Sequence, residues 1–368
     1  MARQIVRSQE AAEPGYSRFL RRSKEWIHSQ DQTARCGYWK ISMVKRKLIL
    51  AAELGILAFF LIAARPSRAE TYPDRTIKLI IPLAPGGGTD VTGRTLADAI
   101  AADWKATIVP ENRTGGGTTI ASAAVAAAPA DGYTVYVNTA SFLISARMMP
   151  KLSYDPQKDF VPVSLAASSD HVLVVSANLP VKTFGEFVAW VKSKKGGATF
   201  ASFGAGSSSH LGFELFLHQM GLSMTHVPYK GNAPAMTDLL GGHVDAMFAD
   251  HVDESLKSDR LRILAVAGSK RSPELPDVPT LQELGLKNFT SRSFYGVMLR
   301  SGTPQPIIEK WNAAINEALQ KPEVQAKLRL LGIDPIGSTQ AEYANYLKAE
   351  DEKYGEALVL PSVQQGLN

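Results

Sequence analysis

The chain has 368 residues, with 40 Lys and Arg, 35 Asp and Glu, and a single Cys. Residues 1–69 hold 13 of the basic and 5 of the acidic residues, which leaves 27 against 30 in the remainder. That remainder carries a formal charge of minus three, which removes the electrostatic basis for binding nucleic acid. About 300 residues bury an adequate core without a disulfide framework.

Residues 43–69, "MVKRKLILAAELGILAFFLIAARPSRA", have the organisation of a secretory signal peptide. Three basic residues precede an apolar stretch over 48–64, and the small residues Ser67 and Ala69 predict cleavage after Ala69. A retained membrane anchor is the alternative, but the apolar stretch is short and contains Glu53. We therefore expect a protein exported to the periplasm.

Residues 1–42 precede this signal, are polar and basic, and show no pattern of their own. We expect Met43 to be the true start and residues 1–42 to be a non-native upstream extension. The only cysteine, Cys36, lies in that extension. The exported chain would then contain neither a disulfide nor a cysteine for lipid attachment.

From residue 72 onward, short β-rich runs alternate with helical patterns. In the first series, strands are predicted over 76–84, 106–111 and 132–140, and helices over 89–105, 118–128 and 141–149. In the second series, strands are predicted over 171–178, 198–204, 224–229, 244–250 and 261–268, and helices over 183–195, 209–221 and 233–242. Three helical stretches, 304–320, 322–332 and 340–359, close the chain.

Two such series predict an α/β protein with two lobes, each a mostly parallel sheet flanked by helices. We expect residues 70–170 to form the first part of lobe 1 and residues 171–291 to form lobe 2. Residues 292–368 would return to lobe 1 and supply the C-terminal helices. No low-complexity linker separates the series, so we expect short crossing strands between the lobes.

The first glycine turn, residues 84–90 ("APGGGTD"), lies between a predicted strand and a predicted helix. Glycines there bring backbone N–H groups close to a ligand, and a helix N-terminus favours anions. Contiguous glycines match neither the P-loop nor the dinucleotide-binding pattern. The alternative is a tight turn in which Thr89 or Asp90 caps the helix.

The second glycine turn, residues 204–210 ("GAGSSSH"), repeats this arrangement in the second series. Two anion-ready helix ends on two lobes indicate one ligand held between them, at the carboxyl ends of the strands. Both turns lack arginine, and Arg94 lies more than one helical turn past the glycines, so we expect it not to reach back. Neutral donors would then hold a ligand carboxylate.

Catalytic and metal sites find little support. The pattern G-x-S-x-G is absent, and Ser209 and His210 are adjacent on a helix, so their side chains diverge. Neither HExxH nor paired Cys/His spacing occurs, and we expect no metal and no cofactor. His171 and His251 each follow an Asp, which is more typical of a loop or strand-edge pairing.

Polar residues also end two strands of the second series. Tyr229, in "VPYKG", could close over a ligand, or it could simply be a half-buried aromatic residue that packs against its neighbours. Asp250, at the end of "VDAMFAD", could accept a hydrogen bond from a ligand amine or hydroxyl, or cap the next segment.

Eight stretches together resemble the periplasmic substrate-binding receptors of tripartite tricarboxylate transporters, the Bug family. They are "YPDRTIKLIIPLAPGGGTD", "VPENRTGGGTTIAS", "APADGYTVYVNT", "YDPQKDFVPVSLAA", "FASFGAGSSSHLGFELF", "VPYKGNAPAMTDLLGGHVDAMFAD", "LRILAVAGSKRSPELPDVPTLQELG" and "SGTP". The resemblance covers nearly all of residues 72–360. It implies a two-lobed flytrap fold, type II-like.

The resemblance also implies which residues bind the ligand. They are Ala84, Pro85, Gly86, Gly87, Gly88, Thr89, Asp90, Asn112, Thr139, Ala140, Ser141, Gly204, Ala205, Gly206, Ser207, Ser208, Ser209, His210, Tyr229, Lys230 and Asp250. In such receptors backbone groups, hydroxyls and ordered water hold a ligand carboxylate.

The sequence departs from the family at "SFYGVMLRSGTP", where Phe294 replaces a frequent Trp and Leu299 with Arg300 replaces an Ala-Pro pair. We therefore expect the ligand pocket to differ in shape from that of other family members on its hinge side.

The expected function is a non-enzymatic receptor, monomeric, that captures a small organic carboxylate and delivers it to the membrane permease subunits of a tripartite transporter. A secreted α/β enzyme acting on a carboxylated substrate, or a receptor that feeds a sensor kinase, are the alternatives. The sequence does not identify the carboxylate.

Overall fold

The computed structural model describes residues 72–361 except 150, 196 and 253, together with residue 364. The expected upstream extension and the expected signal peptide lie outside these residues. Within the described part of the chain, no helix is long and apolar enough to span a membrane.

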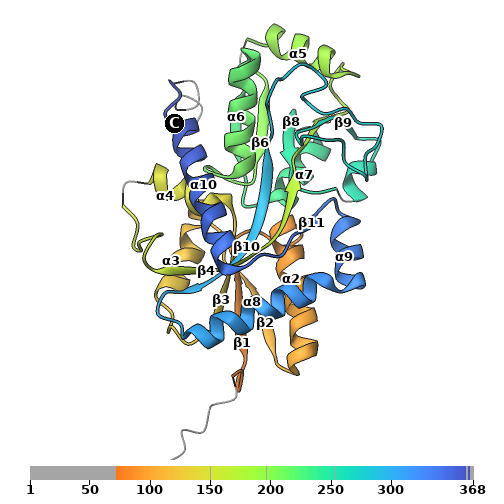
Figure 1. The fold of residues 1–368 in the computed structure, drawn as a ribbon. Helices are drawn as coiled ribbons and strands as arrows, with labels where there is room; N and C mark the ends of the chain where they lie inside the picture. Colours follow the sequence, from red (N-terminus) through yellow and green to blue (C-terminus); the bar gives the residue numbers. More distant parts are fainter. Residues whose placement is uncertain (1–71, 150, 196, 253, 362–363, 365–368) are drawn as a thin grey trace, which may run out of the picture. The chain divides into compact units, whose positions relative to one another are not determined.

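A six-stranded sheet forms the framework of the first lobe (Figure 1). Its strands, in spatial order, are β11 (Asp334–Pro335), β4 (Phe160–Asp170), β10 (Arg292–Arg300), β3 (Thr134–Asn138), β1 (Ile77–Ile81) and β2 (Ile108–Asn112). β1 is parallel to β2 and β3, whereas β10 is antiparallel to both β3 and β4, and β11 is antiparallel to β4. The parallel strands are those that alternate with helices in the sequence, since a parallel pair needs a crossover connection.

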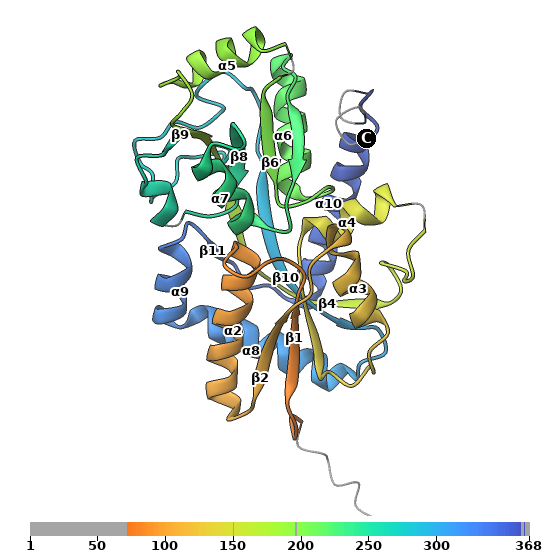
Figure 2. The same ribbon diagram turned by 180° about the vertical axis from the view of Figure 1, so that it is seen from behind.

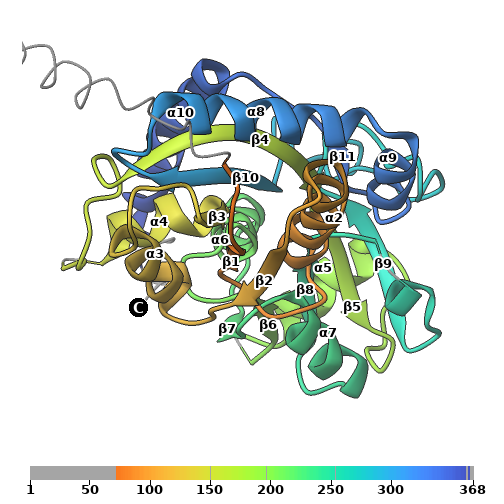
Figure 3. The same ribbon diagram turned by 90° about the horizontal axis from the view of Figure 1, so that it is seen from below.

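Helices cover both faces of this sheet. One face carries α2 (Gly88–Trp104), α8 (Gln305–Gln320) and α9 (Pro322–Arg329), and the other carries α3 (Thr119–Ala126), α4 (Ala140–Met148) and α10 (Gln340–Leu358). A short 3-10 helix, η1 (Gly116–Thr118), precedes α3. Figure 3 shows α8 lying along β4.

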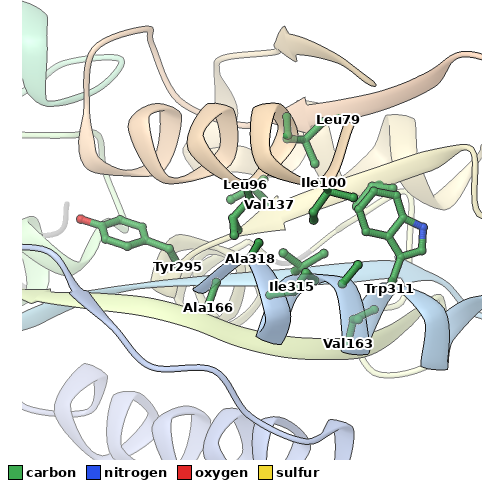
Figure 4. Packing of buried hydrophobic residues seen from close by; sticks show 14 of the residues in the cluster. Leu79, Leu96, Ile100, Val137, Val163, Ala166, Tyr295, Trp311, Ile315 and Ala318 are labelled. Carbon is green, nitrogen blue, oxygen red and sulfur yellow. The ribbon is translucent and has the colours of Figure 1, made fainter. Parts of the chain in front are cut away.

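Alternation along the strands divides the apolar side chains between the two faces. Val137 of β3 packs with Leu79, Ile100, Trp311 and Ile315 between the sheet and α2 and α8 (Figure 4). The preceding residue of β3, a buried tyrosine, belongs to the cluster on the opposite face. Burial on both faces fixes the register of these central strands.

A five-stranded sheet forms the framework of the second lobe. Its order is β7 (Thr225–Pro228), β6 (Thr199–Ser202), β8 (Ala246–Ala249), β5 (Val172–Ser176) and β9 (Leu261–Val266). β6 is parallel to β7 and β8, and β5 is antiparallel to β8 and β9. Helices α5 (Phe184–Ser193) and α6 (Ser208–Met220) pack on one face, and α7 (Asn232–Gly241) and η2 (Glu254–Lys257) on the other.

The expected two-lobed α/β fold is confirmed, but the expectation of mostly parallel sheets is wrong, because both sheets are mixed. Each sheet keeps a set of three parallel strands, as the alternating series predicted, and adds antiparallel strands at the crossing between the lobes. β4 runs through His171 directly into β5, and the returning chain enters β10 after Ser291. These two crossings meet, because the His171 N–H donates to the Ser291 carbonyl at 3.0 Å.

Candidate functional site

The predicted site residues follow the carboxyl ends of parallel strands in both lobes. β1 and β3 end before the starts of α2 and α4 in the first lobe, and β6 ends before the start of α6 in the second. β1 and β3 are hydrogen-bonded neighbours, so the first turns of α2 and α4 lie at one edge of the sheet. Such an edge is where ligands bind in α/β folds.

In the first glycine turn, two glycines are required for different reasons. Gly86 has φ of +86°, a conformation that favours glycine. A Cβ on Gly88 would lie 2.2 Å from the hydroxyl of the buried Tyr295, so a larger residue there would have to displace that side chain. Gly87, with φ of −84°, is the N-cap of α2, and its helix has no side-chain cap.

A network of polar side chains supports this turn from behind. Asp90 accepts hydrogen bonds from the Gly86 N–H at 3.0 Å, from Arg94 Nε at 2.9 Å and from Asn112 Nδ2 at 2.9 Å. Burial opposes ionisation of Asp90, but the hydrogen bonds from Arg94, Asn112 and Gly86 prevail and lower its pKa. Asn112 also donates to the Leu83 carbonyl at 2.8 Å. The side chains of Asp90 and Asn112 thus stabilise the first glycine turn.

The expectation that Arg94 does not reach back needs correction. Its side chain returns by one helical turn to Asp90, and its Nη2 donates to Asn112 Oδ1 at 2.7 Å. An i,i+4 pair on a helix places these two side chains together. Arg94 therefore contributes to the turn indirectly, through Asp90 and Asn112.

The first glycine turn also contacts the second lobe (Figure 2). The Ala84 N–H donates to the Lys230 carbonyl at 3.0 Å, and the Gly88 N–H donates to Asp250 Oδ2 at 3.3 Å. Lys230 takes part through its backbone, and its side chain is exposed. These contacts bring the start of α2 against the strand ends of the second lobe.

The second glycine turn is largely satisfied by its own hydrogen bonds. Ser207 caps α6 by accepting from the His210 N–H at 3.2 Å, and Ser209 Oγ accepts from the Phe203 N–H at 3.1 Å. The Gly206 N–H donates to His210 Nδ1 at 3.2 Å. Ser208 Oγ lies 3.3 Å from His171 Nε2, at the crossing of the lobes.

This turn packs against the first lobe at a different place from the first turn. A Cβ on Gly206, whose φ is +72°, would lie 3.1 Å from the Ser145 hydroxyl of α4. The Ala205 carbonyl would lie 2.9 Å from a Cβ on Gly117. The two glycine turns thus contact opposite lobes at separate positions.

The loop after β3 presents unsatisfied polar groups. Thr139 is the N-cap of α4, with φ of −138°, and its side chain makes no capping hydrogen bond. Thr139 Oγ1 and Thr89 Oγ1 are among several buried side-chain atoms of the described residues that have no hydrogen-bond partner, and these two lie at helix starts that follow β3 and β1. Ala140 and Ser141, in the first turn of α4, are also buried. An unsatisfied buried hydroxyl costs about 1–3 kcal/mol, so these positions call for a functional explanation.

Tyr229 and Asp250 have protein partners. Tyr229 donates to Asp238 Oδ2 at 2.6 Å, and burial together with that carboxylate raises the pKa of Tyr229 to about 12. Asp250 Oδ1 lies 2.6 Å from His251 Nδ1, a side-chain pairing of the kind expected for an Asp followed by a His.

Sequence reasoning missed the residues that surround Asp250. Ser169 and Tyr295 lie on the crossing strands β4 and β10, and their hydroxyls are 2.8 Å apart. Asn232 starts α7, and its Oδ1 accepts from the Asp250 N–H at 3.4 Å. Of these residues, only Asn232 could have been suspected from the sequence, because it directly follows Gly231.

The departures from the family pattern affect packing within the first lobe. Phe294 is fully buried and packs edge-on against Tyr346 at 5.3 Å between ring centroids. Leu299 belongs to the core beneath α2 and α8, and Arg300 Nε donates to the Ala126 carbonyl at 2.7 Å.

A cavity of about 650 Å³ lies between α4, α10 and the start of β4. Its lining includes Phe142, Phe160 and Leu347, with Arg147 and Asp351 paired at 2.6 Å. No predicted site residue lines this cavity.

Two sheets joined by crossing strands, with the start of α2 against the strand ends of the second lobe, define a two-lobed binding protein of the periplasmic type. The chain belongs to the tripartite tricarboxylate transporter receptor family, whose model matches residues 92–359. It is therefore a periplasmic solute-binding protein by family, and the resemblance seen in the sequence is confirmed.

Relatives and solved structures agree with this assignment. Protein BugT of Bordetella pertussis is 36% identical over 309 residues, which cover 83% of this chain and 95% of BugT. MatC from Rhodopseudomonas palustris with bound malate is 31% identical, with a TM-score of 0.73 over 78% of this chain and 100% of MatC. R. palustris Rpa4515 with adipate is 30% identical, with a TM-score of 0.77 over 80% of this chain and 98% of that one.

Proposed function

We propose that this protein is a periplasmic receptor that captures a small organic carboxylate and passes it to the permease subunits of a tripartite transporter. The observation that carries this proposal is the pair of unpartnered, buried hydroxyls of Thr89 and Thr139. They lie in the first turn of α2 and at the N-cap of α4, after two neighbouring strands. A ligand carboxylate would accept hydrogen bonds from both hydroxyls and from N–H groups of the two helix starts other than that of Gly88, which donates to Asp250.

The donors on this proposed site are neutral. Arg94, the cation nearest in sequence to the first glycine turn, is paired with Asp90. Hydrogen bonds to a charged group contribute about 1.5–3 kcal/mol each, so several account for micromolar affinity at about 8 kcal/mol. The relatives solved with malate and adipate support a carboxylate as the ligand.

The proposal includes the organisation of the chain. Cleavage after Ala69 would release a mature protein that works as a monomer. We place the lobe boundaries at residues 170/171 and 291/292, next to the meeting point of the two crossings. Residues 70–170 and 292–368 would form lobe 1, and residues 171–291 would form lobe 2.

A thermal-shift experiment with Thr89→Val and Thr139→Val tests the binding site. Removing an unpartnered buried hydroxyl should leave the unliganded protein equally or more stable. Both variants should lose the stabilisation by malate, adipate or another carboxylate that raises the wild-type melting temperature. At one hundred times its dissociation constant, such a ligand stabilises the wild type by about 2.7 kcal/mol.

Thr95→Val is the matched control for these variants. Thr95 Oγ1 is also buried and unpartnered, but Thr95 lies six residues beyond Thr89, about 9 Å further along α2. Thr95→Val should keep the full ligand response. Full ligand stabilisation in both Thr89→Val and Thr139→Val would refute the proposed site.

The rival functions are separated by what becomes of the ligand. Incubation of the protein with a pool of carboxylates, followed by mass spectrometry of bound and free compounds, should show retention without conversion. Conversion of a compound would identify the secreted enzyme instead. Loss of uptake on deletion of the gene supports transport, whereas intact uptake with a lost transcriptional response indicates a sensor-kinase partner.

A further inference from the structure

Asp250 joins the two lobes through its side chain. It follows β8 of the second lobe, and 2% of its surface is exposed. Its Oδ2 accepts a hydrogen bond from the N–H of Gly88, the first residue of α2 in the first lobe, at 3.3 Å. This places the protein's own carboxylate at a helix N-terminus, where a negative charge is favoured.

The backbone of the same residue binds the strands that cross between the lobes. The Asp250 carbonyl accepts a hydrogen bond from the Tyr295 hydroxyl of β10 at 3.1 Å and another from the Ser169 hydroxyl of β4. Its N–H donates to Asn232 Oδ1 at the start of α7. Asp250 thus connects α2, both crossing strands and α7.

Both carboxylate oxygens of Asp250 are already engaged by protein groups. Oδ2 faces the start of α2, and Oδ1 lies 2.6 Å from Nδ1 of His251, which is equally buried. A ligand carboxylate placed against the same N–H would meet the charge of Asp250 at close range. The contact is therefore better suited to holding the lobes together than to receiving the ligand's anionic group.

We propose that Asp250 is an interlobe latch, a positioning residue whose carboxylate at the start of α2 stabilises the closed arrangement of the lobes. Opening the lobes breaks the contact with Gly88, so the latch raises the closed fraction before a ligand arrives. Its effect on affinity rests on the proposed function, because a ligand that binds the closed form has an apparent dissociation constant inversely proportional to the closed fraction.

Fluorescence energy transfer between the lobes tests the latch without a ligand. Dyes would be attached through Asp98→Cys on α2 and Lys192→Cys on α5, both exposed positions, in the chain with Cys36→Ser. Asp250→Ala should shift the ligand-free protein towards lower transfer efficiency. Asp250→Asn, which keeps an oxygen acceptor but loses the charge, should give a smaller shift in the same direction.

Asp245→Asn is the matched control. Asp245 precedes the same strand, and its Oδ2 accepts from the Thr199 N–H at 2.7 Å within the second lobe. This variant should leave the interlobe distance unchanged. If Asp250→Ala does not fold, the Asp250→Asn protein still decides the question.

Ligand titration gives the second measurement. A fall in the closed fraction from near one to about one tenth raises the apparent dissociation constant about tenfold, and this is the change expected for Asp250→Ala. Unchanged transfer efficiency in both Asp250 variants would overturn the latch. Tighter carboxylate binding by Asp250→Ala would also overturn it, since it would show that the side chain competes with the ligand.

The two proposals fail in different ways. If no carboxylate binds the wild type, the proposed function is wrong, yet the ligand-free distance measurement still tests the latch. If carboxylates bind and the ligand-free distance does not depend on Asp250, only the latch is wrong.

Discussion

His171 and Ser291 tie together the two strands that cross between the lobes. The His171 N–H donates to the Ser291 carbonyl at 3.0 Å, and His171 Nδ1 lies 2.8 Å from Ser291 Oγ. The other ring nitrogen lies 3.1 Å from Ser293 Oγ and 3.3 Å from Ser208 Oγ. One buried imidazole therefore joins both crossings to the start of α6.

This arrangement predicts an acid-sensitive contribution to stability. Burial lowers the pKa of His171 to about 3, so the folded protein keeps it neutral while the unfolded chain binds a proton below about pH 6.5. The unfolded state then holds more protons, and stability falls as pH falls through 6.5 towards 3. Between pH 7 and pH 5 the loss from this residue should be about 2 kcal/mol.

Urea unfolding of wild type and His171→Gln at pH 7 and pH 5 measures how much His171 contributes to the pH dependence of the unfolding free energy. The variant should be less stable at pH 7, because it loses hydrogen bonds, but its stability should fall less on acidification. An equal fall in both proteins would show that His171 is not the group that titrates.

Glu214 should act in the opposite direction. It is buried on α6, 4.0 Å from His210 Nε2, and His210 stacks on His226 at 3.6 Å between ring centroids. Burial raises the pKa of Glu214 to about 7, so stability is full below the unfolded pKa of about 4.5 and is lost as pH rises towards 7. Glu214→Gln should stabilise the protein by about 1–3 kcal/mol at pH 8 and by little at pH 4. Thermal denaturation at both pH values checks this, and equal effects at the two would contradict it.

Gly88 and Gly87 should respond differently to alanine. A Cβ on Gly88 would overlap the Tyr295 hydroxyl at 2.2 Å, whereas one on Gly87 would have its nearest neighbour at 3.6 Å. We expect Gly88→Ala to push the start of α2 away from Tyr295 of the same lobe and to weaken carboxylate binding more than tenfold, about 1.4 kcal/mol. Gly87→Ala, with φ of −84°, should bind within about twofold of wild type. Calorimetric titration compares the two, and equal affinities would argue against the close approach.

Arg94→Gln tests the network behind the first glycine turn. The variant removes the guanidinium from Asp90 and Asn112, so Asp90, which is nearly buried, loses its charged partner. Because Arg94 itself is partly exposed, we expect a loss of about 1 kcal/mol in unfolding free energy. Arg113→Gln, at an exposed pair with Glu111, is the control and should cost less than about 0.5 kcal/mol. A loss in Arg94→Gln no larger than in the control would show that the network does not support the turn.

Processing of the exported protein is checked by mass. Protein recovered from the periplasm should begin at Glu70, because the segment ending in Ser67, Arg68 and Ala69 has the form of a signal-peptide cleavage site. Intact-mass spectrometry reports the first residue directly. Recovery of exported protein that retains residues 1–42 would contradict both the Met43 start and the signal.

The local order of the chain could be predicted from the sequence, because it depends on neighbouring residues. Helical spacing of apolar residues placed a helix at 89–105, and the structure has α2 at Gly88–Trp104. Gly86 and Gly206 were recognised as turn residues, since a positive φ is a local requirement. The two series of strands and helices likewise indicated two lobes before any contact between them was known.

The partners of polar side chains were decided by the tertiary structure. Nothing in the sequence showed that Asp250 meets Gly88, 162 positions away, or that Arg94 turns back to Asn112 on a neighbouring strand. The resemblance implied that Tyr229 and Asp90 bind the ligand, and only the tertiary structure showed that their side chains also hydrogen-bond to Asp238 and Arg94. A side chain's chemistry is set by its residue type, but which groups lie within hydrogen-bond distance depends on how sheets, helices and crossing strands pack, and that geometry is a property of the whole fold.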